Sequence, residues 1–124
     1  MLQRPDPFNA QCPTRRVLDR IGDKWAVLIL ILLERGPLRF NQLRREIPGL
    51  SQKMASQTLE SLARDGLVSR RAFATVPVTV EYAITPLGQT LAATVDALRL
   101  WGETHIGEVL AAQRAYDGTT SAAM

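Results

Sequence analysis

The stretch GLSQKMASQTLESLARDG, residues 49–66, decides how the chain folds, because it has the periodicity of one amphipathic helix and a stop signal at its end. Ser51 is placed to cap the first turn, and Gly66 followed by Leu67 is typical of a helix that ends in a left-handed residue. The residues expected on its inner side are Met54, Ala55, Leu59, Leu62 and Ala63. The other side carries amides, hydroxyls and single cations instead of the usual mixture of Glu and Lys.

A shorter helix is expected immediately before this one. Asn41 can cap a helix over residues 42–47, in which Leu43 and Ile47 lie four residues apart and face inward. Pro48 disfavours the continuation of that helix past Ile47. Only residues 48–50 then separate the two helices, and two short helices joined by so short a turn predict a helix-turn-helix.

The stretch GDKWAVLILILLERGP, residues 22–37, is apolar on every side. Its Ile and Val residues would also suit a buried strand. Asp23 as an N-cap, Gly36 and Pro37 as a stop, and a span of about twelve residues favour a central core helix instead. A further short helix is expected over residues 14–20, directly after Pro13.

Two segments after the helix-turn-helix alternate between apolar and polar residues. They are LVSRRAF, residues 67–73, and VTVEYAI, residues 78–84, and they predict the two strands of a hairpin. The link between them, ATVP, is long enough to project as a wing, and its Pro77 is tolerated only at an edge or in a loop. The chain therefore predicts a mainly α-helical fold with a small antiparallel β wing.

The last helix is expected to begin at Pro86, after Thr85 as its cap, and to run to about residue 112. At 1.5 Å per residue it would be roughly 40 Å long, which is more than the rest of a small domain can cover. A second copy of the chain is the expected cover for its far half. The alternative is a break near Gly102 or Gly107 that folds the helix back onto its own domain.

One domain over residues 12–113 is therefore expected, between a flexible arm of residues 1–11 and a flexible tail of residues 114–124. Charged residues are distributed unevenly along the chain. Residues 1–80 contain 13 Lys and Arg against 7 Asp and Glu, a net charge of +6, whereas residues 81–124 contain 2 against 5, a net charge of −3. This asymmetry favours a polyanionic partner for the first part, although composition alone suits a solvated basic surface equally well.

The outward side of the helix in residues 49–66 fits duplex DNA. Its members are Gln52, Lys53, Ser56, Gln57, Glu60 and Arg64. Gln can pair with adenine through two hydrogen bonds, Lys can reach guanine or phosphate, and the major groove has the width of one helix. Between residues 35 and 71 there are 8 basic and 3 acidic residues, a concentration that favours phosphate contacts beside this helix.

At this point the sequence resembles the HxlR-type winged helix-turn-helix transcriptional regulators of bacteria and archaea. The resemblance covers about residues 12–106. It rests on CP (12–13), IGDKW (21–25), RFNQLRREIPGLSQKM (39–54), TLESLARDGLVSR (58–70) and VEYAITPLG (80–88), which are specific in this order. One departure concerns the wing, because the family commonly has a second Pro and then a basic residue where this chain has Val78 and Thr79. The wing tip therefore lacks a cation, and Arg70 and Arg71 are the expected backbone contacts in its place.

The resemblance implies a homodimer with a long terminal dimerisation helix, which binds an inverted repeat in double-stranded DNA and typically represses nearby genes. The expected base contacts come from Ser51, Gln52, Lys53, Ser56, Gln57 and Thr58. The expected backbone and wing contacts come from Arg39, Asn41, Arg44, Arg45, Arg64, Arg70 and Arg71. The expected dimer interface consists of Val17, Leu91, Val95, Leu98, Trp101, Ile106 and Val109.

Cys12 is the candidate sensor residue. If a helix begins at Pro13, the helix dipole together with Arg15 and Arg16 favours the thiolate of Cys12. The resemblance implies a response to oxidants or electrophiles through this residue, whereas the alternative is a purely structural Cys-Pro pair. Enzymatic turnover is not expected, because the chain has no second Cys to resolve a sulfenic acid and its one His, His105, lies far along the chain.

No cofactor and no metal site are expected, since a lone His does not make a metal site. Trp25 and Trp101 could line a pocket for an aromatic effector, but a core role is the more common one. The single Cys suits the reducing cytoplasm, and the longest apolar run, WAVLILILL, is about half of the ~20 residues that span a bilayer. The competing interpretation of the whole chain is a winged-helix protein-interaction module that does not bind DNA.

Overall fold

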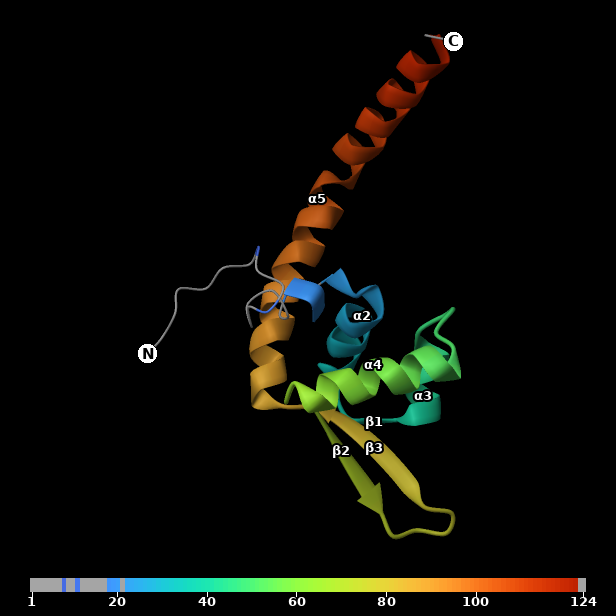
Figure 1. Ribbon diagram of the computed structural model, residues 1–124, viewed down its shortest axis with the longest axis vertical. Coiled ribbons are helices and arrows are strands. Elements are labelled where there is room, and N and C mark those ends of the chain that lie inside the picture. Colours follow the sequence, from blue (N-terminus) through green and yellow to red (C-terminus); the bar gives the residue numbers. More distant parts are fainter. Residues whose placement is uncertain (1–7, 9–10, 12–17, 21, 123–124) are drawn as a thin grey trace, which may run out of the picture.

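The computed structural model describes residues 8, 11, 18–20 and 22–122. Its elements, in the labels of Figure 1, are α2 (Lys24–Leu33), β1 (Leu38–Arg39), α3 (Phe40–Glu46), α4 (Gln52–Arg64), β2 (Val68–Phe73), β3 (Thr79–Ile84) and α5 (Pro86–Ala122). Residues 18–20 are helical, in agreement with the end of the first expected helix. Its earlier part, together with Cys12 and Val17, lies outside the described residues.

Helix α2 forms the centre of the core, so the choice of helix over strand for this apolar stretch is confirmed. Asp23 caps it, because its Oδ1 accepts the backbone N–H of Trp25 at 3.0 Å. The buried core residues come from α2, α3, α4, the start of β2 and the connections on either side of α4, and they are Ala26, Ile29, Leu30, Leu32, Leu33, Leu43, Ile47, Leu50, Ala55, Leu59, Leu62, Leu67 and Val68.

The helix-turn-helix consists of α3 and α4, but α3 begins earlier than expected. Asn41 is not its cap: α3 begins at Phe40, so that Asn41 lies inside the first turn. The reason is that Arg39 is already extended as part of β1, and the Gln42 side chain accepts the Arg39 backbone N–H at 3.0 Å. Leu43 and Ile47 are both buried as expected.

Both expected ends of α4 are confirmed. Ser51 Oγ accepts the Met54 backbone N–H at 3.1 Å. At the other end Gly66 has φ +76°, and the Leu67 N–H donates to the Leu62 carbonyl at 3.0 Å, which is the bond of a Schellman stop. These local signals fix where the helix begins and ends, and so which of its residues face outward.

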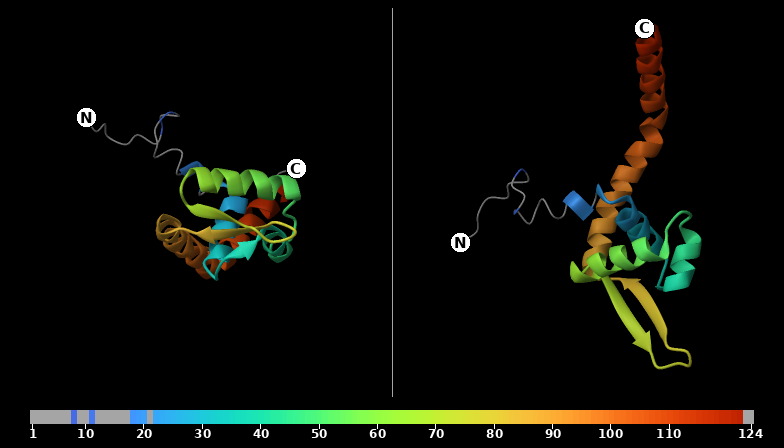
Figure 2. Two further views of the ribbon diagram at one scale, coloured as in Figure 1. Left: turned by 90° about the horizontal axis from the view of Figure 1, so that it is seen from below. Right: turned by 45° about the vertical axis from the view of Figure 1, so that its right-hand side comes forward.

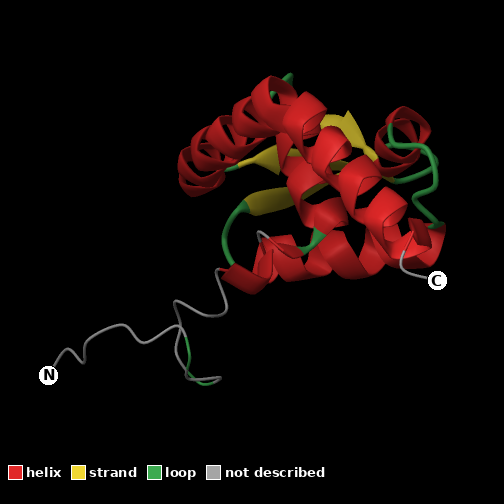
Figure 3. Ribbon diagram, turned by 90° about the horizontal axis from the view of Figure 1, so that it is seen from above, coloured by secondary structure: helices red, strands yellow, loops and turns green. Residues whose placement is uncertain are grey.

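The sheet has three antiparallel strands in the order β1-β3-β2. The hairpin of β2 and β3 is confirmed, and it extends away from the helical body as a wing (Figures 1 and 2). Strand β1 was not expected, because a strand of two residues is too short to show alternation. Seen from above, the helices lie over the small sheet (Figure 3).

Helix α5 is one unbroken helix of 37 residues, so it is about 55 Å long at 1.5 Å per residue. The expected end near residue 112 is wrong, since the helix continues to Ala122 through most of the segment that was expected to be a flexible tail. The alternative of a helix folded back at Gly102 or Gly107 is also wrong. The far half of α5 therefore extends beyond the globular body (Figure 1).

The start of α5 is held tightly against the helix-turn-helix. Thr85 Oγ1 accepts the Gly88 N–H at 3.0 Å and donates to the carbonyl of Gly66 at 2.6 Å. A Cβ on Gly88 would lie only 2.1 Å from the Leu67 carbonyl oxygen, so only glycine fits at this crossing.

Within the described part of the chain, no helix is both long enough and apolar enough to cross a membrane.

Candidate nucleic-acid interface

The outward face of α4 is polar and accessible. All six residues expected there are exposed, namely Gln52, Lys53, Ser56, Gln57, Glu60 and Arg64. The first turn of α4 contains no acidic residue, so an approaching phosphate meets no like charge at that end of the helix. The amides and hydroxyls of this face therefore have the freedom to contact base edges.

Two residues of α4 lie differently from the expectation. Thr58, expected among the base contacts, is only 5% exposed, and Met54, expected inside, is 39% exposed. The physical reason is helical phase: Ala55, Thr58, Leu59 and Leu62 repeat as i, i+3, i+4 and i+7 and form the buried stripe. Thr58 is therefore removed from the candidate base contacts, and Met54 joins the accessible surface.

The cations around α4 are not neutralised within the described residues. The ion pairs found there join Arg20 to Asp65, Arg99 to Asp96 and Glu103, and His105 to Glu108. None of these pairs involves the candidate phosphate ligands, which are Arg39, Arg44, Arg45, Lys53, Arg64, Arg70 and Arg71. Guanidinium groups without an ionic partner suit the phosphates of a nucleic acid.

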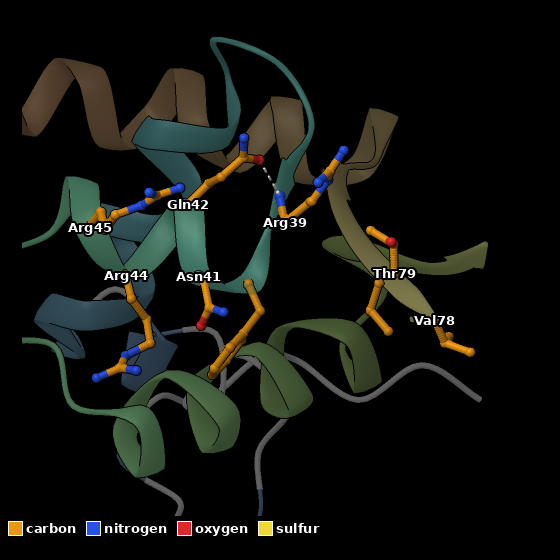
Figure 4. A pocket seen from close by; sticks show the side chains of 9 residues that line it. Arg39, Asn41, Gln42, Arg44, Arg45, Val78 and Thr79 are labelled. Atoms are coloured by element: carbon orange, nitrogen blue, oxygen red, sulfur yellow. Dashed lines mark hydrogen bonds between the residues drawn. The ribbon is translucent and has the colours of Figure 1, made fainter. Parts of the chain in front are cut away.

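Three of these arginines line an open groove between α3 and the wing (Figure 4). The groove has a volume of about 840 Å³. Its α3 side consists of Arg39, Phe40, Asn41, Gln42, Arg44 and Arg45, and its other side consists of Val78, Thr79 and Val80. The groove brings together the expected backbone contacts of α3 and the residues where the wing departs from the family pattern.

Arg70 and Arg71 do not act as one unit, because neighbouring residues of a strand point to opposite faces of a sheet. Arg70 is the register partner of Tyr82, which packs against the core, and it lines a cavity of about 280 Å³ beside Ser56 and Glu60 of α4. Arg71 is the register partner of Glu81, so its side chain lies on the other face of the sheet. Only Arg70 therefore lies next to the outward face of α4. The alternation of the strand was a signal that could have separated the two arginines.

The wing tip is apolar and exposed. Val78 is 69% exposed and Val76 is fully exposed, whereas residues 72–80 contain no Asp, Glu, Lys or Arg. Thr75 orders this loop, since its Oγ1 donates to the Pro77 carbonyl at 2.8 Å and lies 2.8 Å from Thr79 Oγ1. The wing tip is therefore an uncharged loop that hydrogen bonds within the loop hold in place.

Helix α5 carries an uncovered apolar surface. Its exposed members are Leu87, Leu98, Leu100, Trp101, Ile106, Leu110 and Tyr116. Val95, expected in the dimer interface, is instead buried in its own subunit at 2% exposure, and Leu91 packs partly against the core. The reason is that one side of the first turns of α5 packs against the core and α2, so Leu91 and Val95 on that side are not available to a partner. Val109 is half-buried.

Polar groups on α5 have local partners. His105 Nδ1 lies 2.6 Å from Glu108 Oε2, and the rings of Trp101 and His105 are 4.9 Å apart. Where α5 passes the end of α2, desolvation raises the pKa of Glu34, the neighbouring Asp96 carboxylate raises it further, and Arg99 opposes the shift. Among the described residues no group of three or more His, Cys, Asp or Glu side chains could hold a metal ion.

Comparison with known proteins agrees with this geometry. Residues 20–109 match the HxlR-like helix-turn-helix family. The chain is 46% identical over 110 residues to the HTH-type transcriptional regulator YtfH of Escherichia coli (strain K12), over 89% of this chain and 87% of that protein. The structure of the transcriptional regulator ytfH from Salmonella typhimurium has a TM-score of 0.82 and 41% identity, over 90% of this chain and 99% of that one.

A redox regulator is also similar. The structure of the redox regulator HypR in its oxidized form has a TM-score of 0.69 and 39% identity, over 75% of this chain and 96% of that one. The match to the family model extends over most of the chain and includes α2, the helix-turn-helix, the wing and about the first two thirds of α5. The chain therefore belongs to the HxlR-like helix-turn-helix family and is a helix-turn-helix transcriptional regulator.

Proposed function

We propose that the protein is a homodimeric repressor that binds an inverted-repeat operator in duplex DNA. The observation that carries this proposal is the outward face of α4, where exposed amides and hydroxyls stand beside cations that have no described ionic partner. Such a face supplies base-edge hydrogen bonds, and the surrounding cations supply sequence-independent affinity for phosphate.

The base contacts come from the first two turns of α4. Gln52 and Gln57 suit adenine, which offers one donor and one acceptor in the major groove, and Lys53 suits guanine. Ser51 serves as the helix cap, so its hydroxyl oxygen is already engaged with the Met54 N–H. Gln57 lies one turn after Lys53 on the exposed side, which supports the proposal that both residues reach bases in one major groove.

Dimerisation would supply the two-fold symmetry of the operator. The exposed residues Leu98, Trp101 and Ile106 form an apolar surface on a helix that extends past its own domain. An apolar surface of this kind suits a second copy of the same chain, because closed two-fold pairing buries it on both subunits. The two α4 helices would then be held at a fixed separation, which must match the spacing of the operator half-sites.

Salt dependence tests DNA binding against the competing protein-interaction module. The upstream DNA of the chain's own gene is footprinted, and affinity for the protected duplex is measured by fluorescence anisotropy over a range of salt concentrations. We expect log affinity to fall linearly with log salt by about 0.9 for every phosphate contacted. A protein that gives no footprint and no salt-dependent affinity for duplex DNA is not the proposed repressor.

The base contacts have their own test. Gln57→Ala should reduce discrimination between the protected duplex and a scrambled one by about 1–3 kcal/mol, the usual worth of one good base-edge pair. Thr58→Val is the matched control, because the neighbouring Thr58 is buried and the change nearly preserves its volume. A Gln57→Ala variant that keeps full discrimination would remove Gln57 from the base contacts.

Cys12 is proposed as a redox-responsive residue. Support comes from the similarity to the redox regulator HypR, and from the sequence context of the one Cys in this chain. The reaction would join the Cys12 Sγ atoms of two subunits as a disulfide, and the two electrons and two thiol protons that are lost would pass to an oxidant such as diamide, which is reduced to its hydrazine. Diamide should produce a covalent dimer on non-reducing gels and change operator affinity, and Cys12→Ser should abolish both effects without changing affinity under reducing conditions.

A further inference from the structure

The groove between α3 and the wing has two walls of different chemistry (Figure 4). The α3 wall presents Arg39, Arg44 and Arg45. The opposite wall presents Val78, Thr79 and Val80, and no acidic residue lines either side. One wall therefore attracts anions, whereas the other offers methyl groups and one hydroxyl.

The guanidinium groups of the α3 wall make few hydrogen bonds to other described residues. Of the three arginines on this wall, only Arg44 has a side-chain hydrogen bond to a described residue, a long one of 3.5 Å from its Nε to the Leu50 carbonyl. Arg39 bonds to Gln42 only through its backbone N–H. Arg45 is exposed, so at least two guanidinium groups of this wall keep their donors for a ligand.

The opposite wall is ordered before any ligand arrives. Thr75 links the loop to Pro77 and Thr79 by hydrogen bonds of 2.8 Å, and strand pairing joins Thr79 to Phe73 and Val80 to Ala72. An ordered loop loses little conformational entropy when it contacts a partner. Exposed valines on such a loop therefore gain from burial at low entropic cost.

We infer that this groove holds one backbone strand of the operator, with phosphates on the α3 wall and deoxyribose rings against the valines of the wing. A DNA strand has this same division, because its phosphates are anionic and the carbon atoms of its sugars are apolar. The inference rests on the proposed function and deepens it. It assigns to the wing an uncharged contact with sugars, in place of the basic contact that the family pattern implies.

The salt dependence of DNA affinity distinguishes the contacts made by the α3 wall from those made by the wing wall. On the footprinted duplex, Arg45→Ala should lower the slope of log affinity against log salt by about 0.9 for each phosphate that the arginine neutralises in the wild type. A double variant of the two valines that line the groove, Val78→Thr and Val80→Thr, should weaken binding several-fold and leave the slope unchanged, because neither valine carries a charge. Val78→Lys should steepen the slope by a similar increment for each phosphate that the new lysine reaches.

Hydroxyl-radical footprinting reads the sugar contact directly, since the radical attacks deoxyribose. Wild-type protein should protect a few sugars at the outer edges of the footprint. The double Val-to-Thr variant should lose that outer protection and keep the central protection given by α4. Arg45 and Val78 are exposed and Val80 is half-buried, and circular dichroism with thermal unfolding checks that each variant retains the fold.

The outcomes distinguish this inference from the proposed function. If the wild-type protein shows no salt-dependent duplex binding, the proposed function fails and the inference fails with it. If the wild type binds DNA but the double Val-to-Thr variant keeps its affinity and its outer protection, the sugar contact is overturned alone. If Arg45→Ala leaves the slope unchanged, the phosphate side of the groove is overturned, and the groove belongs to another occupant such as a small anionic ligand.

Discussion

The direction in which a side chain points from its helix or strand decides whether it can reach DNA. On β2, the pleat separates Arg70, which lies beside Ser56 and Glu60 of α4, from Arg71, which faces the other side next to Glu81. The two arginines have the same charge and are adjacent in sequence, so they form a matched pair. A difference between them can come only from geometry.

We expect Arg70→Ala to weaken operator binding and to reduce the salt slope by about 1, as removal of one phosphate ligand does. Arg71→Ala should change both quantities less, because its side chain points away from α4 and lies over the Phe73 ring at 5.0 Å. Fluorescence anisotropy at several salt concentrations measures both variants. Equal effects from the two substitutions would contradict the assignment of Arg70 alone to this surface.

Glu34 gives a prediction on pH. Desolvation and the neighbouring Asp96 raise its pKa above the ordinary value of 4.5 in the folded protein. The folded state therefore binds this proton more tightly than the unfolded state, so stability is lost as pH rises through the interval between the two pKa values. Glu34→Gln should raise the melting temperature at neutral pH, and the gain should vanish below about pH 4, where the carboxyl is protonated in both states. A gain that persists unchanged at low pH would exclude this cause.

At the scale of elements, local signals in the sequence predicted most of the fold. Asp23, Ser51 and Thr85 cap the helices that they were expected to cap, and Gly66 ends α4 as predicted, because caps depend only on residues within one turn. Strand β1 escaped prediction because two residues owe their strand conformation to pairing with β3 and not to their own pattern.

The candidate site was predicted in composition but not in its arrangement. The outward face of α4 could be predicted from the helical period, yet Met54, which lies at the edge of the inner stripe, is exposed, and Thr58, which lies within the stripe, is buried. The groove between α3 and the wing could not be predicted at all. It depends on how β1 and β3 pair across about forty residues of sequence, which no local pattern encodes.

The crossing of α5 over the end of α4 gives a prediction on stability. Gly88→Ala would place a methyl group 2.1 Å from the Leu67 carbonyl oxygen, so we expect a loss of about 1–3 kcal/mol, the usual cost of overpacking. Gly107→Ala is the control, since it lies in the same helix with open space around it and should stabilise by about 0.5–1 kcal/mol. Urea unfolding measures both. A Gly88→Ala variant as stable as the wild type would show that the two segments can separate without cost.

The exposed surface of the molecule differs in chemistry from one region to another. The outward face of α4 is polar, whereas α5 carries exposed apolar side chains over a helix of about 55 Å. Because Val95 and Ala92 are already buried in their own subunit, the surface left for a partner begins near Leu98 and continues outward. Contacts made that far from the core would fix the distance between two α4 helices.

Subunit pairing is therefore the property on which operator binding should depend. Leu98→Glu or Trp101→Glu should convert the dimer to a monomer, because a charge placed in an apolar interface is desolvated without a partner. Sedimentation equilibrium measures the mass, and anisotropy on full and half operators measures binding. Ala111→Glu adds the same charge on another side of α5 and serves as the control. A monomeric variant should lose most of its affinity for the full operator and retain weak affinity for a half-site, because one α4 helix remains intact. Should the Leu98 and Trp101 variants sediment as dimers, the apolar surface of α5 would have to serve a different partner.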